Sequence, residues 1–299
     1  MLTRVLPSIA VICAALLWSV DGFLRQDLHR LSSLVIVALE HLIGALIFLP
    51  FLFRSASKIK LLDNKGWISI FWVSICGGLL GTYFYTKALG YVNYIDLSVV
   101  VLIQKLQPLF AISLASIILR EKLSKRFILL ASTAMLGGYL VTFGYKPLLF
   151  LDDKSIIASL FALLASFCWG SSTVLGKAAL KQIPFELVTC IRLIVTGTVA
   201  LLIITSSGNL SEINNLSIEN YKTIIIIVFT SGSIALSIYY YGLQKLAASH
   251  TTIYELVWPL SAVLLDWLMK GKTLSLAQMI GAIILLSSMK ILTKENYSE

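Results

Sequence analysis

Three polar residues lie within four positions of a proline inside an apolar stretch, "VVVLIQKLQPLF" at residues 99–110. The polar residues are Gln104, Lys105 and Gln107, and the proline is Pro108. Proline has no N–H to donate to the carbonyl four residues earlier, which here belongs to Gln104. In a membrane such a break survives only against protein or a watery cavity. A lysine deep in a bilayer costs about 3 kcal/mol or more unless it is paired or hydrated. The stretch therefore predicts a broken helix with polar side chains facing a cavity.

A second proline repeats this arrangement 151 residues later, where Pro259 follows Glu255 by one helical turn. We expect the carbonyl of Glu255 to be left free in the same way, with Tyr254 and Trp258 beside it. In this interpretation Lys105 binds a carboxylate or phosphate of a substrate, and Glu255 binds an amine or carries a proton. The alternative is that Lys105 belongs to a structural ion pair or a simple kink inside the bundle.

Four aromatic residues extend the candidate site. Trp18 and Trp169 occupy matching places in "AALLWSVDGFLRQDL" (14–28) and "ASFCWGSSTVLGKAAL" (165–180), and Tyr85 is the counterpart of Tyr239. An aromatic belt at the membrane surface explains the tyrosines, and the alternative is a stacking wall for a substrate. The full set of candidate substrate-binding residues is Gln104, Lys105, Gln107, Glu255, Tyr254, Trp258, Tyr85, Tyr239, Trp18 and Trp169, with Pro108 and Pro259 as helix breakers.

Other charged residues lie within apolar stretches. Glu40 and His41 are expected to form structural pairs with Arg192 across the two halves of the chain. Asp21 follows Trp18 by one turn and either caps a helix, faces solvent or lines the cavity. Asp266 is expected at the membrane interface.

The composition identifies the solvent of these stretches as lipid. Of the 299 residues, 58% are hydrophobic and 13% are charged, and the mean hydropathy is +0.89. An average soluble domain has about 25% charged residues. A spanning helix needs about 20 mostly apolar residues. The sequence offers ten such stretches, at roughly 7–24, 34–53, 66–88, 97–119, 127–144, 156–176, 186–205, 222–243, 250–268 and 275–292.

The charges in the connecting loops predict the orientation. With ten spans, one side carries 14 Lys and Arg residues and the other carries 7. Because basic loops stay in the cytoplasm, both termini are expected there, in the inner membrane of the cell, with the first span retained. Loops near an anionic membrane surface also explain the net charge of +9 better than a nucleic-acid partner does.

The matched landmarks divide the chain into two repeats, residues 1–150 and 151–299. Each holds five predicted helices, and an odd number makes the second copy enter the membrane from the opposite face. The expected fold is thus an all-α integral membrane protein with two inverted five-helix repeats, a construction common among secondary transporters.

The order of these motifs resembles the EamA-type transporters of the drug/metabolite transporter superfamily. In that family each half often has a proline, an apolar run and G-E-x-x-S. Here Pro108 precedes "LREKLS" (119–124), and Pro259 precedes "MKGKTLS" (269–275). Trp258 stands where the family often has Glu. The resemblance covers about residues 7–292 and implies transport of small polar metabolites through a pocket between the halves.

The sequence has no nucleophile–base pair, phosphate-binding loop or metal-ligand spacing, and its four cysteines lie apart in apolar runs. We therefore expect no enzyme activity, metal or cofactor. The predicted function is secondary active transport, by alternating access, of an amino acid or a related zwitterion or amine. The partners are the lipid bilayer, the metabolite, and a proton or counter-substrate, in a monomer or a homodimer. The alternatives are exchange of S-adenosylmethionine or a nucleotide derivative, a non-transporting scaffold, and an enzyme acting on lipid.

Overall fold

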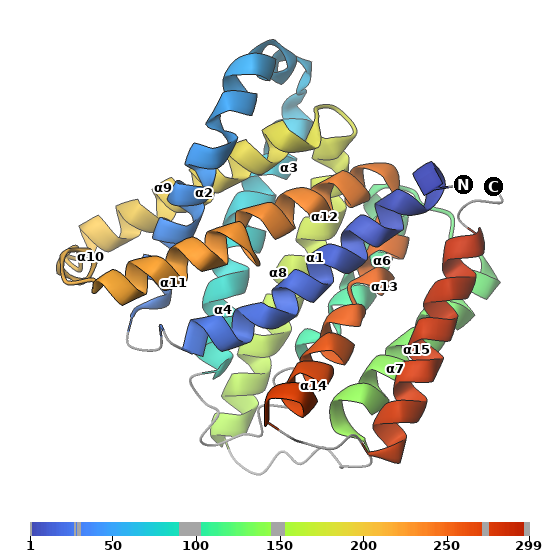
Figure 1. Cartoon of the computed structure of the whole chain (residues 1–299). Helices are drawn as coiled ribbons and strands as arrows, with labels where there is room; N and C mark the ends of the chain where they lie inside the picture. Colours follow the sequence, from blue (N-terminus) through green and yellow to red (C-terminus); the bar gives the residue numbers. More distant parts are fainter. Residues whose placement is uncertain are drawn as a thin grey trace.

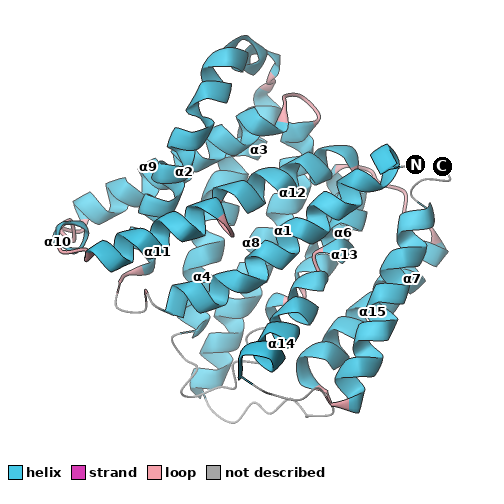
Figure 2. Ribbon diagram, viewed as in Figure 1, coloured by secondary structure: helices cyan, strands magenta, loops and turns pink. Residues whose placement is uncertain are grey.

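A computed structural model describes residues 2–26, 28, 31–89, 103–144, 153–270 and 275–295. All regular elements within these ranges are helices, as Figure 2 shows. The predicted all-α secondary structure is therefore confirmed for the described residues.

The helices of the first half begin near the N-terminus, which lies at the same end of the bundle as the end of the last helix (Figure 1). They are α1 (Leu2–Gln26), α2 (Ser33–Ser55), the short η1 (Ala56–Leu61), α3 (Asn64–Trp72), the π-helical η2 (Val73–Leu80), α4 (Gly81–Leu89), α6 (Gln107–Ile118) and α7 (Lys125–Phe143).

The helices of the second half follow in chain order. They are α8 (Asp153–Leu180), α9 (Phe185–Ser206), the short α10 (Ser211–Asn214), α11 (Ile218–Phe229), α12 (Ser233–Lys245), α13 (Ala248–Tyr254), α14 (Val257–Lys270) and α15 (Leu276–Glu295).

Seven helical stretches of the described residues are long and apolar enough to span a membrane. They are Ser33–Leu61, Asn64–Ala88, Lys125–Phe143, Ile156–Leu180, Phe185–Ser206, Ile218–Lys245 and Leu276–Lys294, and two shorter apolar helices cover Val5–Asp21 and Gln107–Ile118. The count of ten spans stays a prediction, because the predicted span 97–119 lies partly outside the described residues and the span 250–268 is divided into α13 and α14.

Polar caps begin several helices where the apolar stretches start. Ser32 and Ser124 accept hydrogen bonds from the backbone of Val35 and Phe127 at the starts of α2 and α7. Asp63 does the same for Gly66 at the start of α3, at 2.7 Å. This hydrogen bond from the Gly66 backbone lowers the pKa of Asp63, and a hydrogen bond from the Gln182 side-chain amide lowers it further. These caps fix the helix ends at the loops.

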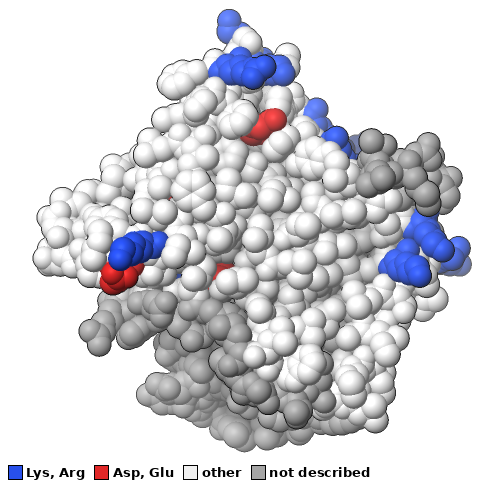
Figure 3. Space-filling model, in the orientation of Figure 1, with Lys and Arg blue, Asp and Glu red and all other residues white. Residues whose placement is uncertain are grey.

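The outer surface of the bundle suits lipid. Large apolar side chains such as Phe53, Leu129 and Ile283 are exposed. In Figure 3 the Lys and Arg side chains lie toward the top, right and left edges of the view, and the broad centre of this face carries almost no charge. Apolar surface on this scale fits a hydrocarbon environment rather than water.

The two halves pack against each other helix by helix. The most extensive helix contacts join α2 to α9 and α7 to α15. Figure 1 shows α15 beside α7 along its length. The contacts of α1 with α12 are matched by those of α4 with α8, and those of α1 with α14 by those of α6 with α8. Exchanging the halves reproduces this pattern of neighbours, which supports the predicted repeat.

Two adjacent glycines offer a test of the α7–α15 contact. A Cβ atom at Gly137 would lie 2.8 Å from the backbone nitrogen of Leu285 and 2.9 Å from the carbonyl oxygen of Gly281. At Gly138 the nearest atom, in the Leu256 side chain, is 3.9 Å away. Overpacking typically destabilises by about 1–3 kcal/mol, whereas Gly→Ala in a helix gains up to about 1 kcal/mol. Gly137→Ala should therefore lower the melting temperature of the purified protein and Gly138→Ala should not. Equal melting temperatures for the two variants would contradict this packing.

Candidate substrate site

Both proline segments break their helices where the sequence predicts. Helix 103–104 ends in a turn at Lys105 and Leu106, and α6 begins at Gln107, which puts Pro108 in its first turn. Proline is well tolerated there because its missing N–H would be unpaired in any case. The turn is held by bonds to the residue three positions earlier, Leu106 N to Ile103 O and Leu109 N to Leu106 O.

In the second half, α13 ends at Tyr254 and α14 begins at Val257, close to Pro259. The expectation that the carbonyl of Glu255 is free is wrong, because the backbone N–H of Trp258 donates a hydrogen bond to it at 3.0 Å. A tight three-residue turn thus satisfies the group that the proline leaves without its usual partner. What this segment offers to a substrate is its side chains.

The two breaks meet through a line of five polar side chains, which we call the polar chain. Gln104 donates to Gln107 at 3.2 Å, and Gln107 donates to Glu255 at 2.6 Å. The Tyr239 hydroxyl donates to the other oxygen of Glu255 at 2.7 Å and lies 2.9 Å from the Thr173 hydroxyl. The polar chain runs from the first half, through α13–α14 and α12, to α8.

Lys105 lies beside the polar chain without joining it. Its ammonium lies 3.6 Å from the centre of the Trp258 ring, which is a cation–π contact. Within the described ranges the close ion pairs involve Arg25 and Lys222 but not Lys105. The structural ion pair considered for Lys105 is therefore not formed with any described acidic residue.

Two matching aromatic pairs each have one residue on a helix of the polar chain, Tyr239 on α12 and Trp169 on α8. Trp18 of α1 packs on Tyr239 with ring centres 5.2 Å apart and an angle of 53°. Trp169 of α8 packs on Tyr85 of α4 with ring centres 5.4 Å apart and an angle of 56°. Each pair takes one residue from each half, as the repeat predicts, and Trp169 is further fixed by its hydrogen bond to the carbonyl of Gly77 at 3.1 Å.

One expected site residue lies elsewhere. Tyr254 is fully buried, and its hydroxyl receives a hydrogen bond from Thr293 of α15 at 3.0 Å. Tyr254 thus connects α13 to α15. Thr173 was not predicted from the sequence, although it is one of the small polar residues that follow Trp169.

A second polar cluster lies near the interruption between α11 and α12. Arg25 bonds both Asp21 and Glu40, the latter at 2.8 Å, and Ser231 donates to Asp21 at 2.6 Å. Arg192 donates to the Tyr240 hydroxyl at 2.6 Å. The expected direct pairing of Glu40 with Arg192 is therefore wrong, because the ion pair of Glu40 is formed with Arg25 at the end of α1. Asp266 lies outside the residues whose side chains are described.

Hydrogen bonds also join helix ends at the end of the bundle that holds the start of α1. Lys177 of α8 donates to the carbonyls of Leu243 and Gln244 at the end of α12, and Gln244 donates back to the carbonyls of Leu180 and Ile183. Similarly, Glu121 accepts from the backbone of Ala248 and Ser249 at the start of α13. This end is closed by helix capping that sequence spacing alone did not reveal.

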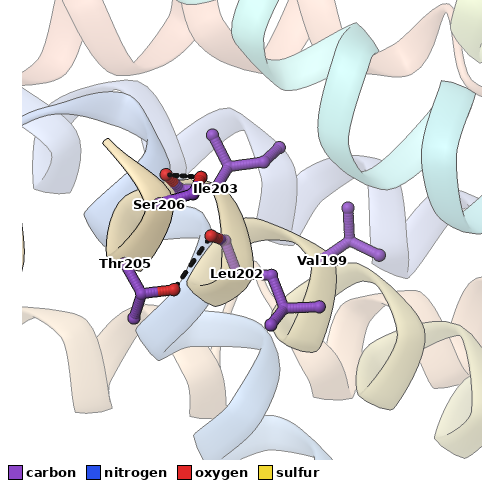
Figure 4. Close-up of a pocket in the computed structure, with 5 residues that line it drawn as sticks. All are labelled: Val199, Leu202, Ile203, Thr205 and Ser206. Carbon is purple, nitrogen blue, oxygen red and sulfur yellow. Dashed lines mark hydrogen bonds between the residues drawn. The ribbon is translucent and has the colours of Figure 1, made fainter. Parts of the chain in front are cut away.

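The surface hollow drawn in Figure 4 is unrelated to these clusters. It is lined by five residues of α9, Val199, Leu202, Ile203, Thr205 and Ser206. Its hydroxyls are already bonded to backbone carbonyls of the same helix, Thr205 to Leu202 and Ser206 to Ile203. It therefore offers a ligand mainly apolar contacts on one helix.

Comparison with known proteins gives the family. The model of the EamA-like transporter family matches the chain twice, at residues 6–143 and 156–293. This chain belongs to the EamA-like transporter family. The two matched segments of the EamA-like transporter correspond to the two halves described above.

Relatives of this EamA-like transporter cover nearly its whole length. The riboflavin transporter ImpX of Fusobacterium nucleatum is 37% identical over 97% of this chain and 98% of its own. The uncharacterized inner membrane transporter YicL of Salmonella typhimurium is 24% identical over 96% of this chain and 94% of its own. One crystal structure, 17% identical, has a TM-score of 0.75 over 98% of each chain, a likeness that concerns the fold alone. Family and relatives point to a membrane transporter rather than an enzyme.

Proposed function

We propose that this EamA-like transporter carries riboflavin across the cytoplasmic membrane by alternating access, with the substrate bound at the polar chain between the halves. The 37% identity with a protein named as a riboflavin transporter supports this substrate. So does the chemistry of the site. Riboflavin joins a flat, uncharged ring system with a polar imide edge to a polyhydroxyl tail.

The aromatic pairs are the observation that carries the proposal. Trp18 packs on Tyr239, which belongs to the polar chain, and Trp169, which packs on Tyr85, lies one helical turn before Thr173 on α8. Aromatic stacking on a flat heterocycle contributes about 1–3 kcal/mol per ring. The Gln104 and Gln107 amides carry both donors and acceptors, which an imide edge requires.

A zwitterionic amino acid is the second candidate, with Lys105 and Glu255 as its counter-charges. Small-molecule sites usually combine apolar walls with a few placed polar groups, and the number of aromatic residues here favours the larger flat substrate. The two candidates predict different ligands, so one binding experiment separates them.

That experiment is a thermal-shift measurement on the purified transporter. A ligand that binds only the folded state stabilises it by about 2.7 kcal/mol at 100 times its dissociation constant. Riboflavin should raise the melting temperature and amino acids should not. A shift with an amino acid but none with riboflavin would favour the zwitterion, and no shift with riboflavin at saturating concentration would contradict the proposal.

The membrane placement belongs to the same proposal. Ten spans, both termini in the cytoplasm and an inverted second repeat fit the basic loops and the matched helix contacts. Reporter fusions in the 206–220 loop should report the outer side of the membrane. A cytoplasmic report from this loop would reverse the orientation.

A further inference from the structure

The substrate site contains a carboxyl group whose surroundings suit a second ligand. We propose that Glu255 binds one proton and carries it across the membrane together with the substrate, which makes this protein a proton symporter. The inference rests on the proposed transport function for its cargo, and it adds the coupling ion and the residue that binds it.

Within the described residues, the direct hydrogen-bond partners of the Glu255 carboxyl are both neutral, and Lys105 acts on it only through space. One oxygen accepts from the Tyr239 hydroxyl at 2.7 Å and the other from the Gln107 amide at 2.6 Å. Lys105, on the facing break, has its ammonium on the Trp258 ring instead. Removing a carboxylate from water without a paired cation is costly, and binding a proton removes that charge.

Both partners of Glu255 can exchange the roles of donor and acceptor. An amide can turn to present its oxygen instead of its nitrogen, and a hydroxyl can donate or accept. Each partner is itself hydrogen-bonded to a further group. Gln107 accepts from the amide of Gln104 at 3.2 Å, and the Tyr239 hydroxyl lies 2.9 Å from the Thr173 hydroxyl. When one oxygen of Glu255 gains a proton, the arm of the polar chain bonded to that oxygen can therefore reverse its direction of donation, while the other arm continues to donate to the second oxygen.

The buried Glu40 and the part-buried Asp21 lack this freedom. Glu40 and Asp21 both bond Arg25, and a guanidinium can only donate. Protonating either of them would break a charged hydrogen bond. The contrast separates a structural ion cluster at Arg25 from a reversible proton site at Glu255.

Among the described residues, the titratable groups that act directly on Glu255 come from two facing segments. They are the Tyr239 hydroxyl from α12 and the Lys105 ammonium from the turn before α6. The neighbouring helices α1 and α8 contribute Trp18 and Thr173, which do not titrate. Glu255 is therefore the acidic group of this junction that can exchange a proton with water.

Symport follows from the enclosure of the loaded site. A bound substrate displaces the water that would solvate a carboxylate, so the loaded transporter crosses with Glu255 neutral. The proton adds to a carboxylate oxygen from water on the entry side and leaves to water on the exit side. No bond to the substrate forms or breaks.

The test uses purified full-length protein in liposomes. Riboflavin counterflow without a pH gradient is measured first, since it tests transport alone. A gradient of one pH unit, acid on the entry side, should then raise the accumulation ratio of the wild type by up to about tenfold for one proton per substrate. Glu255→Gln should lose this response, with a ratio of accumulation with and without the gradient of about one. The control Glu219→Gln, at an exposed residue paired with Lys222, should respond like the wild type.

The outcomes separate the two proposals. Counterflow without any response to the gradient, an opposite response, or a response that persists in Glu255→Gln overturns the proton site and leaves riboflavin transport intact. If riboflavin counterflow fails, the proposed cargo is wrong, and infrared titration tests the proton site by itself. The wild type should then show a protonated-carboxyl band that titrates and is missing from Glu255→Gln but present in Glu219→Gln. Identical spectra for all three overturn the inference.

Discussion

Arg25→Met is expected to prevent the protein from accumulating in a folded form. Arg25 holds both Asp21 and Glu40, and the Glu40 side chain is only 9% exposed. Removing one partner of a buried ion pair typically destabilises by about 3–5 kcal/mol, because the remaining charge stays buried and unpaired. A loss of that size is a large part of the stability of an ordinary protein, about 5–15 kcal/mol. Yield after purification and melting temperature give the result.

The exposed pair of Lys222 and Glu219 provides the control. These side chains are 60% and 72% exposed, and their nitrogen–oxygen distance is 2.8 Å, equal to that between Arg25 and Glu40. Exposed ion pairs contribute about 0–1 kcal/mol, so Lys222→Met should leave yield and melting temperature unchanged. Adding Glu40→Gln to Arg25→Met should recover part of the loss. Wild-type stability of Arg25→Met would show that the Arg25 cluster is dispensable.

Trp18→Ala is expected to weaken riboflavin binding by about 5- to 150-fold, the equivalent of 1–3 kcal/mol of lost stacking. Trp169→Ala should weaken binding to a similar degree, because Trp169 stands in the matching pair. The change should appear in the dissociation constant measured by quenching of riboflavin fluorescence. Melting temperatures of the unliganded variants separate a binding defect from a folding defect, particularly for Trp169, which also bonds Gly77.

Trp267 supplies the matched control for these variants. It lies on α14 with 44% of its surface exposed, on the apolar exterior. Trp267→Ala should bind riboflavin like the wild type. A folded Trp18→Ala variant with wild-type affinity would show that this aromatic pair does not bind riboflavin.

The sequence predicted the parts of the site that follow from local chemistry. Proline cannot donate the helical hydrogen bond to the residue four positions earlier, so the turns before Pro108 and Pro259 were predictable. The repeat matched Trp18 with Trp169 and Tyr85 with Tyr239. The resemblance to EamA-type transporters, stated from the order of these motifs, is confirmed by the family match.

Partners across the bundle could not be predicted in the same way. Glu40 and His41 were expected to pair with Arg192 across the halves, but the length and direction of α1 bring Arg25 to Glu40 instead. The carbonyl of Glu255 was expected to be free, and a three-residue turn satisfies it. Tyr254 is one residue from Glu255, yet the rotation of α13 turns it toward Thr293 of α15. Each of these depends on helix rotation and packing, which a single sequence does not specify.

Riboflavin counterflow in liposomes tests the central claim most directly, because it requires only the purified protein, its substrate and a sealed membrane. Liposomes loaded with unlabelled riboflavin should take up external labelled riboflavin in a saturable way, and excess unlabelled amino acid outside should not compete. Folded wild-type protein that gives no more uptake than empty liposomes would contradict the account.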